Sequence, residues 1–597
     1  MPVITILPGR TVVEAERGAL LRVALQAAGV LLDYPCAGKG KCRQCRVKMD
    51  PAPAEGGEGL PPAVRDAGYR LACQVKVVSD CTVTIEETGA ARRAWRQGLR
   101  RGDAEAAVAA LSVKRRHVSL TAPSLEDQRA DWERVTDALT AAGISTAPAD
   151  PRGLEHVSRL LREQDWNVDA VCEESDLLCL RPVGGRHALG VAVDLGTTTV
   201  DLALVDLETG DTRARQAFLN GQVSFGADVI SRAQSFHDDN GPVRQAALRT
   251  IEVGAHRLLQ EVGAPASDVA KTVVVGNPIM IHILHGIDPF QLTHVPYVPV
   301  ISGSLRRAPR EMEWTFQRDG CVETLPLISA YVGADTVGMI VALGLEEEKL
   351  TSLSIDIGTN GEMVLARPGQ MLATSTAAGP AFEGAQIACG MRALDGAVTG
   401  LRIGADGEVA LDVVGGGAAR GLCGTGLVAA VAELLNRDLV DTTGRISEPS
   451  AVAPPRLRQR LITVNGEPAF ALNDDGSVYL SQSDIRTLQL AKGAVRTGVD
   501  TLLSKSGLAA EELGALRLAG NFGAGLDAGA AMRIGLVPPM DLERVHVVGN
   551  AALRGAVMAL LSRDCARRSE RAARNTRFVE LGGTAEFQER FMDSMVF

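Results

Sequence analysis

Four cysteines near the N-terminus have the spacing of a metal-bound cluster. Cys36, Cys42 and Cys45 are separated by five and then two residues. Cys73 follows 28 residues beyond Cys45, and the segment 37–41 (AGKGK) is glycine-rich, so its backbone N–H groups can approach inorganic sulfur. Zinc also binds four thiolates, but its sites usually show two short Cys pairs, whereas this chain has a triplet and a single cysteine. The spacing therefore favours a 2Fe–2S cluster over zinc.

Two copies of an Asp-x-Gly-Thr motif, 162 residues apart, are the second chemical signal. Asp194 ends the apolar run LGVAVD, and Asp356 ends the similar run LTSLSID. Such a hairpin tip presents backbone N–H groups and hydroxyls to phosphate oxygens, and the aspartate can hold Mg²⁺ through water. Two facing hairpins would bind a nucleoside triphosphate from both sides. The sequence contains no Walker A pattern, which disfavours a P-loop fold. The candidate nucleotide-contacting residues are Gly196, Thr197, Thr198, Gly358, Thr359, Asn360 and Gly361.

Two further segments complete the candidate nucleotide site. A glycine turn containing Gly520, Asn521 and Gly523 follows the apolar run ALRLA, where the backbone can lie flat against adenosine. Asp335 opens a helical-looking stretch 21 residues before Asp356. A carboxylate there can act as a base or orient water, but a helix N-cap would also favour aspartate. Both interpretations of Asp335 stay open at this point.

Composition sets limits on the class of protein. The chain has 597 residues, 46% hydrophobic and 22% charged, which is typical of several globular domains. A net charge of −10 argues against a nucleic-acid binder, and aromatic residues at 4% argue against base-stacking platforms. The chain has no run of eighteen apolar residues and no signal-like start, so we expect no membrane partner and a cytoplasmic location.

The elements that must position these residues divide the chain into five parts. The first part reads as short strands with one helix, and a basic linker follows it. A small mixed unit without a chemical motif comes next, and the two Asp-x-Gly-Thr copies then each open an α/β half. The predicted boundaries are 1–90, 91–112, 113–187, 188–350 and 351–597.

The motifs carry a family resemblance. The N-terminal cysteines resemble those of plant- and adrenodoxin-type 2Fe–2S ferredoxins, with a first gap of five residues instead of four. The paired hairpins, the glycine turn and Asp335 resemble the acetate and sugar kinase, Hsp70 and actin superfamily of ATPases. The resemblance implies a mixed α+β and α/β fold: a β-grasp-like ferredoxin domain, a small mixed middle domain and an actin-like two-lobed ATPase domain. It also implies ATP and Mg as ligands, with Asp194, Asp335 and Asp356 as catalytic residues.

Together, these domains resemble the reductive activators of corrinoid-dependent methyltransferases. The segments that carry the likeness are 220–232 (NGQVSFGADVISR), 274–287 (VVGNPIMIHILHGI), 377–387 (AAGPAFEGAQI) and 518–538 (LAGNFGAGLDAGAAMRIGLVP). The family implies one-electron reduction of Co(II) to Co(I) in a corrinoid partner, with ATP making an uphill electron transfer possible. It further implies a low-potential electron donor to the cluster, and relatives suggest a homodimer.

Other interpretations remain. The alternative function is a small-molecule kinase of the same superfamily with a redox-sensing ferredoxin domain. Two other classes are disfavoured. A chaperone-like module would need no reducible centre, so the predicted cluster argues against it. An electron-transfer protein with a degenerate ATPase half would not need all three aspartates, so their presence argues against that class. His282 and His285 lie in an apolar stretch and are expected to pack rather than bind cobalt. Cys389 and Cys423 are expected to be small buried residues. The alternative is that they bind a 4Fe–4S cluster shared by the two protomers of a dimer.

Overall fold

The computed structural model describes residues 1–7, 11–28, 45–53, 60, 62–84, 111–145, 151–226, 228–448, 454–523, 525–582 and 585–597. The expected basic linker therefore lies almost entirely outside the described residues, as do Cys36 and Cys42. None of the described helices combines the length and the apolar character needed to cross a bilayer.

The N-terminal domain is a five-stranded mixed sheet with short helices, as the strand-rich pattern predicts. The sheet order is β2-β1-β5-β3-β4, in which β1 and β5 run parallel and the other neighbours run antiparallel. Alternate side chains of β1 point into the core, because successive residues of a strand face opposite sides. Its elements are β1 (Val3–Leu7), β2 (Thr11–Glu14), α1 (Leu21–Ala27), β3 (Arg46–Asp50), α2 (Pro62–Asp66), β4 (Tyr69–Leu71) and β5 (Cys81–Thr84).

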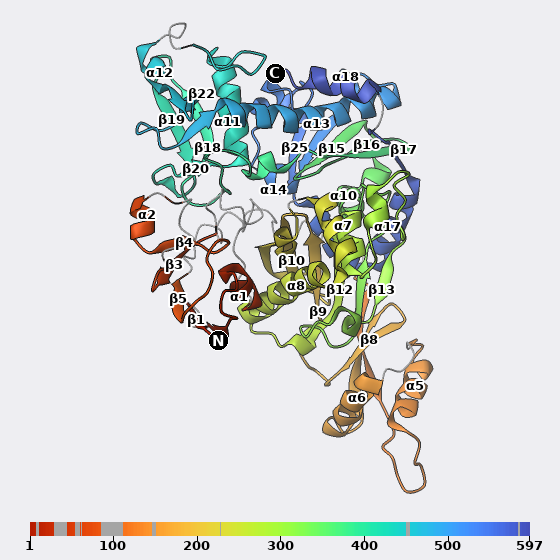
Figure 1. The fold of residues 1–597 in the computed structure, drawn as a ribbon. Coiled ribbons are helices and arrows are strands. Elements are labelled where there is room, and N and C mark those ends of the chain that lie inside the picture. Colours follow the sequence, from red (N-terminus) through yellow and green to blue (C-terminus); the bar gives the residue numbers. More distant parts are fainter. Residues whose placement is uncertain are drawn as a thin grey trace.

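A small mixed unit follows and projects from one end of the molecule (Figure 1). Three antiparallel strands in the order β6-β7-β8 pack against two helices. Leu139, Leu161 and Val168 are among the buried residues of its own small core. Its elements are β6 (Val113–Ser119), α5 (Asp131–Ala141), α6 (Pro151–Glu163), β7 (Asn167–Glu173) and β8 (Asp176–Arg181).

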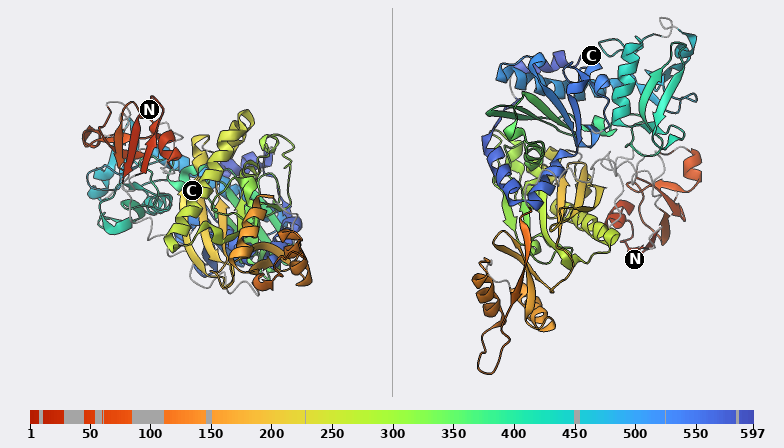
Figure 2. Two further views of the ribbon diagram at one scale, coloured as in Figure 1. Left: turned by 90° about the horizontal axis from the view of Figure 1, so that it is seen from below. Right: turned by 180° about the vertical axis from the view of Figure 1, so that it is seen from behind.

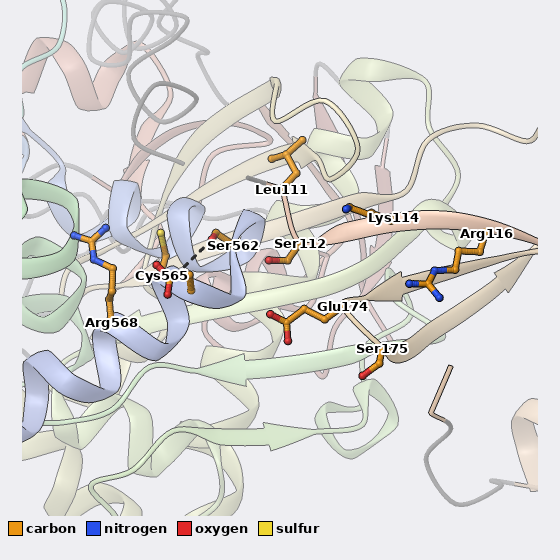
Figure 3. A pocket seen from close by; sticks show the side chains of 10 residues that line it. Leu111, Ser112, Lys114, Arg116, Glu174, Ser175, Ser562, Cys565 and Arg568 are labelled. Atoms are coloured by element: carbon orange, nitrogen blue, oxygen red, sulfur yellow. Dashed lines mark hydrogen bonds between the residues drawn. The ribbon is translucent and has the colours of Figure 1, made fainter. Parts of the chain in front are cut away.

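This unit is joined to the next domain by buried charges. Lys271 is completely buried, and its ammonium group lies 2.6 Å from Glu173 of β7 and 3.5 Å from Glu323. A buried cation of this kind is tolerated only when carboxylates and hydrogen bonds satisfy it. Nearby, a hollow of about 570 Å³ opens between β6 and α17 (Arg563–Asn575), and Figure 3 shows Lys114, Arg568 and Cys565 among the side chains around it.

Two six-stranded sheets form the centre of the remaining chain and share a five-stranded core. The first has the order β11-β10-β9-β12-β14-β13, and the second has the order β25-β24-β15-β16-β17-β26. In each, three antiparallel strands are followed by two parallel strands. When the edge strands β13 and β26 are left out, the remaining five strands of each sheet have the order 3-2-1-4-5. The internal repeat seen in the sequence is therefore a repeat of topology.

The strands of the first sheet are β9 (Leu189–Leu195), β10 (Thr199–Asp206), β11 (Thr212–Leu219), β12 (Val269–Gly276), β13 (Leu305–Arg307) and β14 (Cys321–Thr324). Those of the second are β15 (Ser352–Ile357), β16 (Gly361–Arg367), β17 (Gln370–Thr376), β24 (Ala515–Ala519), β25 (Val545–Gly549) and β26 (Thr576–Phe578). The helices that accompany the first sheet are α7 (Val229–Asp238), α8 (Asn240–Val262) and α9 (Pro278–Leu284).

Helices α10 (Ala334–Leu343) and α16 (Ala551–Leu561) connect the two lobes. Buried residues of α16 belong to the core of the first sheet, although in the chain α16 lies between β25 and β26 of the second sheet. Met339 and Ile340 of α10 pack with strands of the second sheet. A Cβ on Gly555 would lie 2.1 Å from the carbonyl oxygen of Gly338, so the two helices touch backbone to backbone. Each lobe thus contains a helix that the other half of the chain contributes.

An additional subdomain is inserted between β17 and β24. Two three-stranded sheets and α11 lie beside the long helix α13, above the N-terminal domain in Figure 1. Its elements are β18 (Ala397–Ile403), β19 (Val409–Val413), β20 (Gly421–Leu422), α11 (Gly424–Asn436), α12 (Pro455–Arg460), β21 (Leu461–Val464), β22 (Glu467–Ala471), β23 (Tyr479–Ser481) and α13 (Gln482–Ser506). The described chain ends in α18 (Ala585–Ser594), which packs along α13 (Figure 1).

Candidate ATPase site and cluster domain

The two predicted hairpins meet between the lobes. The hydroxyl oxygens of Thr198 and Thr359, which lie 161 residues apart in the chain, are 3.0 Å apart. The Thr359 hydroxyl donates its single proton to Glu383 at 2.6 Å, so the Thr198 hydroxyl is the donor to Thr359. The sequence motifs alone did not specify this direct bond between the two tips.

The register of each hairpin places a second acidic residue opposite the predicted aspartate. Asp194 pairs with Asp201 across β9 and β10, and Asp356 pairs with Glu362 across β15 and β16. Asp201 is almost fully buried and pairs with Arg215 at 2.9 Å. Sequence reasoning missed both residues, although their spacing after Asp-x-Gly-Thr is similar in the two copies.

The structure brings the three predicted catalytic carboxylates together. Burial and, to a smaller extent, the nearby Asp335 together raise the pKa of Asp356 to about 7. Burial likewise raises the pKa of Asp335 to about 6. Burial raises the pKa of Asp194 well above its usual range, and Asp201, Asp335 and Asp356 add to this effect. Such a concentration of carboxylates favours the arrival of a cation.

Asp335 is not the N-cap of its helix. Helix α10 begins at Ala334, with Gly333 in the N-cap position, and Asp335 lies in the first turn. Its carboxylate accepts the backbone N–H of Thr336 at 2.7 Å and remains partly exposed. A side chain on Gly333 would collide with the carbonyl oxygen of Gly276 at 2.5 Å, so the start of α10 lies directly against the end of β12. A helix N-terminus in this position favours negative charge.

Asn550 is a site residue that the sequence analysis missed. It caps α16, and its side-chain oxygen accepts the N–H of Leu553 at 2.7 Å. Its amide group donates to Asp194 at 2.8 Å and to Asp201 at 2.9 Å. Asn277 plays a similar part, because it caps α9 and donates to the hydroxyl of Thr197 at 3.1 Å.

A repeated dipeptide could have revealed these asparagines. Gly-Asn follows an apolar strand three times, at residues 276–277, 520–521 and 549–550. Gly520 has φ of +83°, and a Cβ there would lie 2.3 Å from a carboxylate oxygen of Asp356. The glycine turn predicted to contact adenosine therefore begins in direct contact with Asp356. Gly523 is the last residue of the short helix α14 (Gly520–Gly523).

The other predicted hairpin residues lie at the two tips. A Cβ on Gly196 would be 2.6 Å from the carbonyl oxygen of Thr199. The backbone N–H of Gly358 donates to the carbonyl of Asn360 at 3.0 Å, and a Cβ on Gly361 would lie 2.9 Å from the hydroxyl oxygen of Thr376. Gly196 and Gly361 therefore leave no room for a side chain, which keeps the turns tight.

Two of the four predicted cluster ligands are described, and they lie close together. Cys45 immediately precedes β3, and Cys73 follows β4. Arg46 pairs with Leu71 across these strands, and the N–H of Ala72 donates to the carbonyl of Cys45 at 2.9 Å. Both cysteines are therefore at the same end of the β3–β4 pair, buried in the core of the N-terminal domain. This placement fits two thiolate ligands of one cluster.

The N-terminal domain packs directly on the first lobe, beside α8 (Figures 1 and 2). Leu219 and Val223 of the first lobe belong to the same buried cluster as Cys45 and Cys73. Between them, Asn220 donates its side-chain amide to the carbonyl of Gly196 at 2.8 Å. A single short segment thus contacts both the domain of the cysteines and the tip of the first hairpin.

His282 and Cys423 are buried, as expected, whereas Cys389 is only half-buried, so the expectation of a buried residue was wrong for Cys389. His282 is fully buried and hydrogen-bonds the carbonyl of Pro278 at 2.7 Å, and its other ring nitrogen accepts the N–H of Val300. Burial lowers the pKa of His285 to about 4, which suits packing of a neutral ring. Cys423 is buried, with its sulfur 3.2 Å from the carbonyl oxygen of Val398.

Domain-family comparisons cover nearly the whole chain. The matching models are a 2Fe-2S iron-sulfur cluster binding domain over residues 4–78, the RACo linker region over 102–184, the RACo middle region over 189–348, and the C-terminal domain of RACo, the ASKHA domain, over 350–597. ASKHA denotes the acetate and sugar kinase, Hsp70 and actin superfamily.

Individual relatives agree with these models. The corrinoid activation enzyme RamQ of Eubacterium limosum is 31% identical over 421 residues, which are 68% of this chain and 70% of RamQ. The reductase of the Co(II) methylated amine-specific corrinoid protein of Methanosarcina barkeri is 25% identical over 61% of this chain and 68% of its own. A solved reductive activator for corrinoid, iron–sulfur protein matches with a TM-score of 0.73 and 28% identity, covering 100% of this chain and 98% of that one. The chain therefore belongs to the family of reductive activators of corrinoid proteins, which combine a 2Fe–2S domain with an ASKHA ATPase domain.

Proposed function

We propose that this protein uses ATP to drive one-electron reduction of Co(II) to Co(I) in a corrinoid protein. The observation that carries the proposal is the segment Leu219–Val223, which packs on the cysteine-bearing domain and also bonds the first hairpin tip. A change at the hairpins on nucleotide binding would therefore reach the redox domain through two or three residues.

A 2Fe–2S cluster held by Cys36, Cys42, Cys45 and Cys73 would supply one electron at low potential. Each 59 mV of uphill potential lowers the equilibrium constant about tenfold. A nucleotide-driven change could offset this by stabilising the Co(I) form of the partner over its Co(II) form, and about 1.4 kcal/mol of differential affinity offsets each tenfold. The electron donor that refills the cluster is proposed to be a low-potential carrier.

ATP is proposed to bind between the two hairpins, where Thr198 and Thr359 meet. Mg²⁺ is proposed to be held through water by Asp194 and Asp356. Asp335, in the first turn of α10 and with its pKa raised to about 6, is proposed to orient or deprotonate the attacking water.

The test is a spectroscopic assay under anaerobic conditions. The purified protein is mixed with a Co(II) corrinoid protein and a low-potential reductant, and the visible spectrum is followed with and without Mg–ATP. Appearance of Co(I) only with ATP supports the proposal. ATP hydrolysis with no change at cobalt, for several corrinoid proteins, would contradict it and favour phosphate transfer to a small acceptor.

A further inference from the structure

A completely buried arginine lies beside the candidate nucleotide site without a carboxylate bonded to it. Arg232, on α7, has no exposed surface. Its Nε donates to the carbonyl of Gly226 at 3.0 Å, and its Nη1 lies 3.6 Å from the sulfur of Met280. In the described part of the chain, its Nη2 has no hydrogen-bond partner. One arm of the guanidinium is therefore unsatisfied.

Three other buried cations are paired with carboxylates, whereas Arg70 and Lys492 donate to backbone carbonyls. Arg232 differs from these because one of its arms has no hydrogen-bond partner among the described residues. Arg134 lies 2.7 Å from Asp127, Arg181 lies 3.1 Å from Asp268, and Lys271 lies 2.6 Å from Glu173. Asp228, near Arg232 in sequence, is exposed and caps α7 instead. A buried guanidinium without an anion and with an unpartnered arm destabilises the folded state, so we expect a functional reason for it.

Arg232 is linked to both hairpins through intervening residues. Met280, on which it packs, is in the helix capped by Asn277, and Asn277 bonds the hydroxyl of Thr197 in the first tip. On the other side, burial lowers the pKa of Arg232 to about 9, and Asp228 and Glu383 oppose this effect. Glu383 is the carboxylate that accepts the hydroxyl of Thr359 in the second tip.

We infer that Arg232 binds the terminal phosphate of the nucleoside triphosphate, with Nη2 as the donor. This inference rests on the proposed ATP site between the hairpins. The planar guanidinium suits phosphate oxygens, and burial strengthens the interaction because little water competes. ADP lacks the terminal phosphate, so Arg232 would let the protein distinguish ATP from ADP.

The test compares nucleotide affinities of Arg232→Met and Arg232→Lys with the wild type. Met keeps much of the buried volume without the charge, so it is suited to fold in an apolar environment. We expect Arg232→Met to weaken binding of a non-hydrolysable ATP analogue at least thirtyfold and binding of ADP less than threefold, as measured by calorimetry. Arg232→Lys should lie between these values. Arg249→Met, an exposed change on α8, is the control.

The outcomes separate this inference from the proposed function. If Arg232→Met weakens binding of both nucleotides equally, or leaves the preference for the ATP analogue unchanged, the proposed role of Arg232 is wrong. The proposed ATP site is not affected by that outcome. Failure of the wild type to bind either nucleotide overturns the ATP site and the inference together. Thermal unfolding without nucleotide provides a second readout: Arg232→Met should keep or raise the wild-type Tm, yet lose the rise in Tm that the ATP analogue gives the wild type. A folded variant with an unchanged ATP-induced rise would contradict the inference.

Discussion

Asn220 and Gly196 are joined by a hydrogen bond of 2.8 Å, in which the side-chain amide of Asn220 donates to the backbone carbonyl at the first hairpin tip. The backbone N–H of Asn220 also donates to the carbonyl of Thr198 at 2.9 Å. Val223, three residues later, is part of the core that contains Cys45. The hairpin tip and the redox domain thus share one attachment.

Asn220→Ala is expected to separate ATP turnover from cobalt reduction. The variant loses the donor to Gly196 and the cap of the short helix that begins at Gly221, at a cost of about 1–3 kcal/mol. We expect ATP hydrolysis to fall less than threefold, whereas Co(I) formed per ATP falls at least tenfold, when both are measured in the same anaerobic assay. Asn167→Ala, in the small mixed unit, is the control. Equal losses in both quantities would contradict the coupling route.

Asp356→Ala is expected to abolish Mg–ATP turnover. The substitution removes a proposed water-mediated Mg²⁺ ligand beside Gly520, while the cysteine-bearing domain is unchanged. Phosphate release should fall at least a hundredfold, and the visible iron–sulfur spectrum should match that of the wild type. Asp412→Ala, on an exposed strand, is the matched control. Surviving turnover would show that the phosphate-site assignment is wrong.

The nucleotide-free protein is expected to lose stability as the pH rises from about 4 to 7. The pKa values of Asp335 and Asp356 are raised from 3.8 to about 6 and about 7 in the folded state. In this window the folded state binds more protons than the unfolded chain, so the free energy of unfolding falls with increasing pH. Urea unfolding at several pH values would measure this slope. Asp356→Asn should flatten it, and an unaltered slope in that variant would refute the assignment.

Asn550→Ala is expected to destabilise the protein and perturb Asp194. Loss of the cap of α16 typically costs about 0.5–2 kcal/mol, and the two carboxylates that share the amide lose a donor. Because this hydrogen bond lowers the pKa of Asp194, its removal raises that pKa further. We expect a lower Tm together with a pH profile of ATP hydrolysis displaced to higher pH. Asn550→Asp keeps the cap but not the donor, so a normal pH profile in this variant would argue against the positioning role.

Cys42→Ser is expected to abolish cobalt reduction while ATP binding stays intact. A serine hydroxyl replaces one proposed thiolate ligand, so the cluster should be lost or its spectrum changed. Iron analysis and visible absorption report on the cluster, and calorimetry reports on ATP. Cys81→Ser, a buried strand position outside the proposed ligand set, is the comparison. Full reductase activity without the cluster would refute its electron-transfer role.

The sequence alone predicted the features that depend on a short segment of the chain. The spacing of Cys45 and Cys73 and the two Asp-x-Gly-Thr tips depend on a few neighbouring residues, because a turn or ligand loop is specified by its own glycines, hydroxyls and thiols. The similar hydrophobic strands around Asp194 and Asp356 likewise predicted a repeated α/β half, and the two sheets share a five-stranded core in the order 3-2-1-4-5 once the edge strands β13 and β26 are left out.

The tertiary structure decided which distant groups complete the site. Asn550 reaches Asp194 across 356 residues of chain, because α16 packs on the opposite lobe from its neighbours in sequence. The unsatisfied arm of Arg232 and the attachment of the redox domain at Leu219 also depend on packing between segments that are far apart. A sequence motif determines the local conformation and chemistry of its own residues, whereas the partner of a cap or a buried charge is chosen by the long-range burial of apolar surface.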